Sequence, residues 1–92
     1  MDTVIINAEK NGSKCRFSLS IHCNTSFSYN SPFSFNIKFP SPSSVFTFYI
    51  YSGSKNHKCQ IATSGFLMMY GDSYQTYFSG TFSTNGTLTY SY

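Results

Sequence analysis

The sequence predicts an all-β fold, a small antiparallel β-sandwich or partly open barrel of about seven short strands. Aromatic residues make up 20% of the 92 residues and charged residues only 10%. Phe, Tyr and Thr suit the pleated, half-buried surface of a strand, and helix-forming residues are sparse. Apolar and polar residues also alternate with a period of two in several segments. We expect residues 1–92 to form one domain, because so short a chain has room for a single core.

The N-terminal segments predict a hairpin. A short strand is expected over residues 3–8, followed by a tight turn at Asn11-Gly12, where both residue types tolerate positive φ. Residues 15–23 carry the clearest strand signal in the chain. We expect one face of that strand to lie in the core, and it consists of Cys15, Phe17, Leu19, Ile21 and Cys23.

The middle of the chain predicts two further strands separated by a linker. Residues 24–32 are rich in Ser and Asn, which favours an irregular connection. A strand follows over residues 33–39, and the Pro-rich segment 40–44 ends it. Residues 45–51 are apolar on both faces, which indicates a central strand or a strand whose second face is covered. The inward residues of the first of these strands are expected to be Phe33, Phe35, Ile37 and Phe39.

The C-terminal part predicts short strands joined by glycine-containing turns. Turns are expected at residues 53–56 and 71–73, a bulge or break at Gly65, and a second tight hairpin turn at Asn85-Gly86. The strands themselves are expected over residues 58–64, 66–70, 74–83 and 87–92.

The cysteines and the N-terminus favour a cytoplasmic protein. Three cysteines cannot all close into disulfides within one chain, and Cys15 and Cys23 on one strand lie too far apart to pair. We therefore expect Cys15, Cys23 and Cys59 to be reduced thiols. The first residues lack the features of a signal peptide, and no apolar window is long enough for a transmembrane helix. We expect no association with a membrane.

The residues that usually carry catalysis do not form a recognisable set. Asp2, Glu9 and Asp72 are the only Asp and Glu residues, and nothing predicts that two of them meet around a substrate. The glycines are scattered, so no phosphate-binding loop is expected. His57 and Cys59 share one face of a strand, and His22 and Cys23 are conceivable further zinc ligands, but paired C-x-x-C spacing is absent. We expect no enzyme activity, no cofactor and no metal.

The tyrosines are the most informative feature for function. A domain this small cannot fully bury eight Tyr and ten Phe, so some tyrosines must be exposed. Exposed Tyr surrounded by Ser, Gly and Asn is the composition of antibody-like binding surfaces. Lysines beside them would steer an acidic partner, in agreement with the net charge of +3. The predicted binding residues are Tyr49, Tyr51, Tyr77, Tyr90, Tyr92, Lys55 and Lys58.

These observations favour a non-enzymatic module that binds a protein partner. It would act by surface occlusion, as a small inhibitor of the phage or mobile-element type or as an accessory subunit. One alternative is a glycan-binding β-domain, although Trp, the usual platform for sugars, is absent. Another is a self-assembling structural subunit, a homo-oligomer in which the last strand adds to the edge of a neighbouring copy. Nucleic acid is not expected as a partner, because basic groups occur without the ribonucleoprotein aromatic motif.

Overall fold

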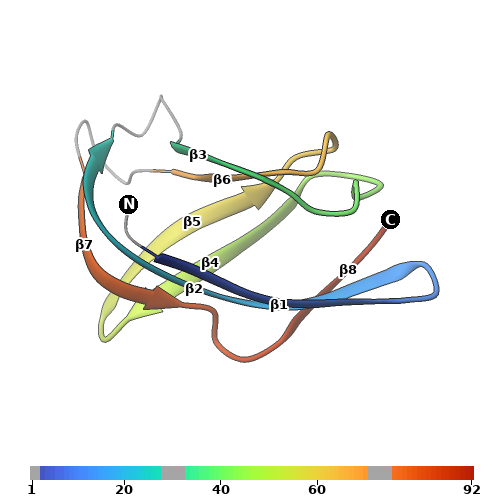
Figure 1. The fold of residues 1–92 in the computed structure, drawn as a ribbon, viewed down its shortest axis with the longest axis horizontal. Coiled ribbons are helices and arrows are strands. Elements are labelled where there is room, and N and C mark those ends of the chain that lie inside the picture. Colours follow the sequence, from blue (N-terminus) through green and yellow to red (C-terminus); the bar gives the residue numbers. More distant parts are fainter. Residues whose placement is uncertain (1–2, 28–32, 71–75) are drawn as a thin grey trace.

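A computed structural model describes residues 3–27, 33–70 and 76–92, and all regular structure in these residues is β-strand (Figure 1). The predicted all-β class is therefore confirmed. The expected turn at residues 71–73, part of the expected connection 24–32, and the side chains of Cys23, Phe33, Lys55 and Tyr77 lie outside the described residues. The strands are β1 (Thr3–Asn11), β2 (Lys14–Phe27), β3 (Phe33–Lys38), β4 (Phe46–Ser52), β5 (Lys55–Ile61), β6 (Phe66–Met69), β7 (Thr76–Ser83) and β8 (Leu88–Ser91).

The strands form one antiparallel sheet that curls into a half-barrel. Their order is β1-β2-β7-β4-β5-β6-β3, and β8 pairs with β2 outside this path. The curl places β3 and β6 across from β1 and β2 (Figure 1). One residue pair, Tyr51 with Ser83, joins β4 to β7, whereas β7 pairs along its whole length with residues 20–27 of β2. The molecule is thus a partly open barrel, as the sequence predicts.

The core lies inside the curl, and β2 is its main contributor. Cys15, Phe17, Leu19 and Ile21 are all buried, whereas the residues that alternate with them are exposed or half-buried. This confirms the predicted alternation. The Phe17 ring makes edge-to-face contacts with four other rings, at centroid distances between 5.2 and 6.1 Å. Those four rings belong to Phe39, Phe46, Phe48 and Tyr90.

The expected hairpin at Asn85-Gly86 is wrong. β7 and β8 do not pair with each other; both pair with β2, through pairs such as Ser20 with Ser83 and Phe17 with Leu88. The segment between them bends away from β2 and is held by Thr84. The Thr84 amide donates to the Leu19 carbonyl (2.9 Å), and the Leu19 amide donates to Thr84 Oγ1 (3.1 Å). The two strands therefore form one interrupted strand beside β2.

Several strand ends also differ from the expectation. The first turn is Gly12-Ser13, one residue later than expected, because Asn11 pairs with Lys14. β2 continues to Phe27, where pairing with β7 supplies the backbone partners that a Ser- and Asn-rich segment does not predict. β5 ends at Ile61, and Gly65, at φ 94°, ends the turn that leads into β6.

Candidate binding face on strands β4 to β6

Strand β4 presents one face to the core and the other to solvent. Phe48 and Ile50 are buried, and the residues that alternate with them point outward. Tyr49 is 44% exposed and Tyr51 is 42% exposed. β4 is central in the sheet, as expected. None of the described residues covers its second face, which is open to solvent. Two large aromatic side chains are therefore held outward by a strand that is anchored in the core.

The neighbouring strands extend this surface. Tyr49 pairs with Lys58 of β5, and Lys58 Nζ lies 4.9 Å from the centre of the Tyr70 ring. Gln60 Nε2 donates to Thr47 Oγ1 at 3.2 Å. On β6, the exposed Phe66 and the half-buried Met68 alternate with buried residues. The resulting β4–β6 face consists of Thr47, Tyr49, Tyr51, Asn56, Lys58, Gln60, Phe66, Met68 and Tyr70.

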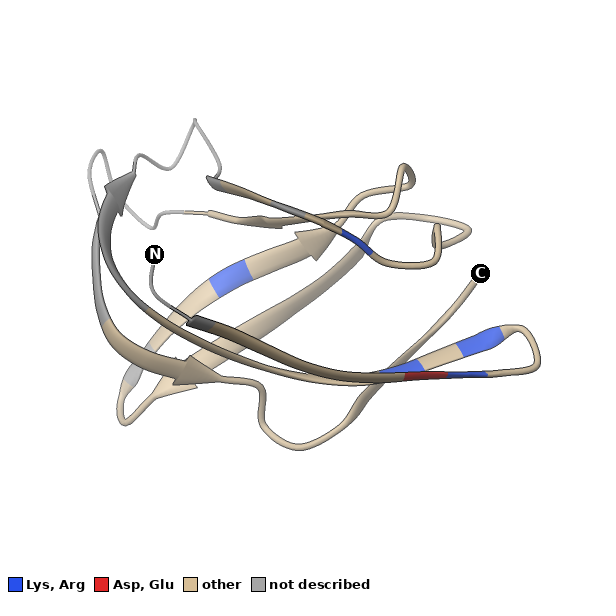
Figure 2. Ribbon diagram, viewed as in Figure 1, with Lys and Arg blue, Asp and Glu red and all other residues tan. Residues whose placement is uncertain are grey.

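The charge on this face is positive. Lys58 lies within it, and at its margin Lys38 Nζ lies 6.0 Å from the centre of the Phe66 ring. The one Asp or Glu side chain among the described residues, Glu9, belongs to β1 (Figure 2). Among the described residues, no carboxylate lies on this face beside Lys58 and Lys38, so these lysines attract an acidic surface.

The predicted binding residues do not all converge. Tyr49, Tyr51 and Lys58 lie together on the β4–β6 face, whereas Tyr90 is only 5% exposed and belongs to the core. Its place in the predicted set is wrong, because its ring packs on Phe17 and its hydroxyl donates to the Pro40 carbonyl at 2.7 Å.

Tyr92 is half-buried and lies elsewhere, beside the β1–β2 turn. Its hydroxyl donates to the Gly12 carbonyl at 2.9 Å, and Lys10 Nζ lies 5.3 Å from its ring centre. The side chains of Tyr77 and Lys55 are not among those described. Sequence reasoning missed Phe66 and Tyr70, because the run 66–70 is also compatible with a helical turn.

The histidine and thiol groups considered for zinc point in different directions. His57 and Cys59 face the core from β5, and the His57 ring lies 4.8 Å from that of Phe82. His22 lies on the exposed face of β2, where Nδ1 is 2.7 Å from Thr81 Oγ1. Within the described part of the chain, no three His, Cys, Asp or Glu side chains come together as a metal site requires.

We expect the protein to lose stability at alkaline pH. Burial raises the pKa of the Cys59 thiol from 9.0 to about 12. Burial, followed by the nearby Cys15 thiol and Tyr92 phenol, raises the pKa of Tyr90 above its usual value of 10.0. Both groups bind protons more tightly in the folded state, so their stabilising contribution is complete below pH 9 and is lost as the pH rises above it. For each proton that only the folded state retains, the free energy of unfolding falls by about 1.4 kcal/mol per pH unit.

Urea unfolding at a series of pH values checks this expectation. Above pH 9 the free energy of unfolding should fall less steeply with pH in Cys59→Ala than in the unchanged protein, because the variant lacks the buried thiol. A slope that does not change in the variant would contradict the assignment of the effect to Cys59.

Comparison with known proteins does not assign this chain to a family. No protein-family model matches the chain, and no curated protein matches it. Within residues 3–27, 33–70 and 76–92 there is no helix with the length and apolarity needed to cross a bilayer.

Proposed function

We propose that this chain is a non-enzymatic protein-binding module that acts by covering a surface of its partner with the β4–β6 face. The observation that carries the proposal is the adjacent exposure of Tyr49 and Tyr51 on a strand whose other face is buried. Such aromatic side chains bring large contact area and few rotatable bonds, so binding orders them at low entropic cost.

The surroundings of the two tyrosines support the same function. β5 pairs with β4 along its whole length, which fixes the backbone that carries the anchors before any partner arrives. Asn56, Gln60 and Thr47 supply polar groups that adapt to a partner's hydrogen bonds. Lys58 adds charge that speeds encounter with an acidic surface. Surface occlusion of this kind suits a small inhibitor of the phage or mobile-element type, or an accessory subunit.

Loss of the two tyrosines should abolish most of the binding. The partner is first captured from a lysate of the source organism or its host, at low and high salt, and identified by mass spectrometry. We expect the double variant Tyr49→Ala/Tyr51→Ala to weaken its affinity by at least about 2 kcal/mol, because both side chains act as anchors. Isothermal titration calorimetry measures the effect.

The control is Ile5→Ala, which removes a large exposed apolar side chain from β1. The control should bind like the unchanged protein, and thermal unfolding should show that both variants fold. Undiminished affinity of the folded double variant would contradict the proposal. Unfolding of the double variant would also contradict it, by making the tyrosines part of the core.

Self-assembly is a second candidate, and the sheet order favours one strand for it. β1 is nine residues long and stands at one end of the strand order, so a second copy can add to its edge. The predicted route through the last strand uses β8, which pairs with β2. A mass in solution that rises with protein concentration supports self-assembly, and a constant monomer mass excludes it.

A further inference from the structure

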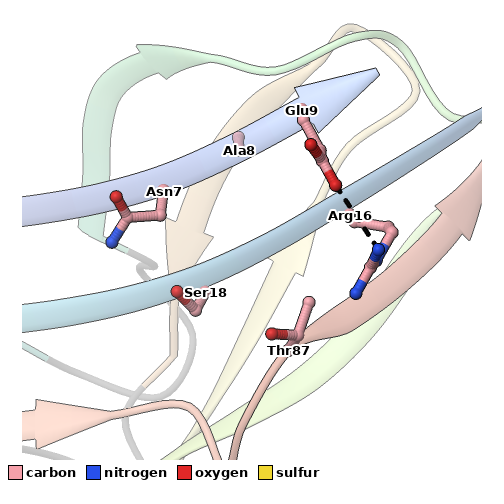
Figure 3. Close-up of a pocket in the computed structure, with 6 residues that line it drawn as sticks. All are labelled: Asn7, Ala8, Glu9, Arg16, Ser18 and Thr87. Atoms are coloured by element: carbon pink, nitrogen blue, oxygen red, sulfur yellow. Dashed lines mark hydrogen bonds and ion pairs between the residues drawn. The ribbon is translucent and has the colours of Figure 1, made fainter. Parts of the chain in front are cut away.

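A shallow groove lies on the other half of the sheet, outside the β4–β6 face. It consists of two adjoining hollows of about 270 and 320 Å³ that share Asn7, Ser18 and Thr87. Figure 3 shows side chains from β1, β2 and the start of the β8 segment around the first hollow. Ile5, Ser20 and Thr84 extend the lining into the second. The groove therefore runs along the outer face of β2.

The groove follows from the sizes of the side chains in neighbouring strands. The outward residues Ser18 and Ser20 of β2 are small and form the floor. Their partners on β1, Asn7 and Ile5, are larger and form one wall. The bend at residues 84–87 forms the other wall. The hydrogen bonds between Thr84 and Leu19 hold this wall in place, so the groove is preformed.

The chemistry of the lining selects a neutral, hydroxyl-rich ligand. Serine and threonine hydroxyls and the Asn7 amide both donate and accept hydrogen bonds, as sugar hydroxyls do. The two charged side chains of the lining, Glu9 and Arg16, pair with each other at 3.4 Å, so the groove offers no net charge. Ile5, 56% exposed, provides an apolar patch at one end for the C–H groups of a sugar ring.

We propose that this groove binds a neutral oligosaccharide. An anionic ligand would find the Arg16 guanidinium already paired with a carboxylate. The site is distinct from the β4–β6 face, so sugar binding and protein binding can be lost separately.

An array of neutral oligosaccharides tests the proposal, followed by saturation-transfer NMR and titration with the strongest ligand. We expect Asn7→Ala to weaken binding by about tenfold, because it removes an amide that can form two hydrogen bonds with the sugar. Ser18→Leu should abolish binding by filling the floor of the groove. The control is Thr63→Leu, a change of a hydroxyl side chain to leucine at an exposed turn residue outside both surfaces, and it should leave sugar binding unchanged.

The outcomes separate this site from the β4–β6 face. Loss of sugar binding in Asn7→Ala and Ser18→Leu, with Tyr49→Ala/Tyr51→Ala unaffected, supports the groove. Sugar binding that is lost only with the tyrosines overturns the groove and moves the glycan to the β4–β6 face. The absence of any bound neutral oligosaccharide also overturns it, while the test for a protein partner keeps its own result. Asn7→Ala, on the exposed face of β1, decides the matter if Ser18→Leu fails to fold.

Discussion

Replacing Phe17 by alanine is expected to lower the free energy of unfolding by about 3–5 kcal/mol. Phe17 is 1% exposed, and its ring contacts the rings of β4, of β8 and of the residue that follows β3. Truncation would leave a cavity among these rings that the strand backbones cannot close. Small domains have little stability to spare, so the variant should be largely unfolded at moderate urea concentrations. Urea titration followed by circular dichroism measures the change.

The control for this prediction is Ile5→Ala on β1. Ile5 is 56% exposed, so its truncation should change stability by no more than about 0.5 kcal/mol. If Phe17→Ala cost as little as this control, the rings around Phe17 would not form the centre of the core.

The second large effect is expected at Gly65. This residue has φ 94°, a conformation that L side chains rarely adopt, and an added Cβ would collide with the carbonyl oxygen of Phe39. The collision involves backbone and cannot be relieved by a side-chain rotation. It would also disturb the hydrogen bond from the Phe39 amide to the Gly65 carbonyl, which is 2.7 Å long. We expect Gly65→Ala to cost more than the roughly 1–3 kcal/mol of backbone strain alone.

Gly53→Ala is the matched comparison. Gly53 has φ 60°, but a Cβ there would meet nothing within 4 Å. Its substitution should therefore cost only the strain of the left-handed conformation, about 1–2 kcal/mol. Equal losses of unfolding free energy in the two variants, measured with urea, would show that the close approach of Phe39 to Gly65 does not add to the cost of Gly65→Ala.

Local patterns were sufficient to predict the strands that carry the core. The alternation from Cys15 to Ile21 predicts both the strand and its buried face, because the period of the side chains decides which of them meet the core. The same reasoning places Tyr49 and Tyr51 opposite Phe48, on the outside of β4. The two tyrosines that anchor the candidate face could therefore be predicted from the sequence.

Features that depend on contacts between residues far apart in the sequence could not be predicted from local patterns. Asn85-Gly86 has the residues of a hairpin turn, but β2 offers backbone partners to both flanking strands. Tyr90 shares the apolar face of its strand with Leu88, but its burial requires the Pro40 carbonyl and the Phe17 ring, which other segments bring to it. Phe66 and Tyr70 join the candidate face only because β6 lies beside β5.

The position of β2 between β1 on one side and β7 and β8 on the other has a consequence for how the chain folds. β1 and β2 can associate as a local hairpin, but Ser20 meets Ser83 only after a loop of 63 residues has closed. Such closure carries an entropic cost before its contacts form, so folding is expected to be slow for a domain of this size. On the ribosome, the second edge of β2 must wait for residues 76–91 to emerge, and during that interval its unpaired backbone groups are open to binding by chaperones.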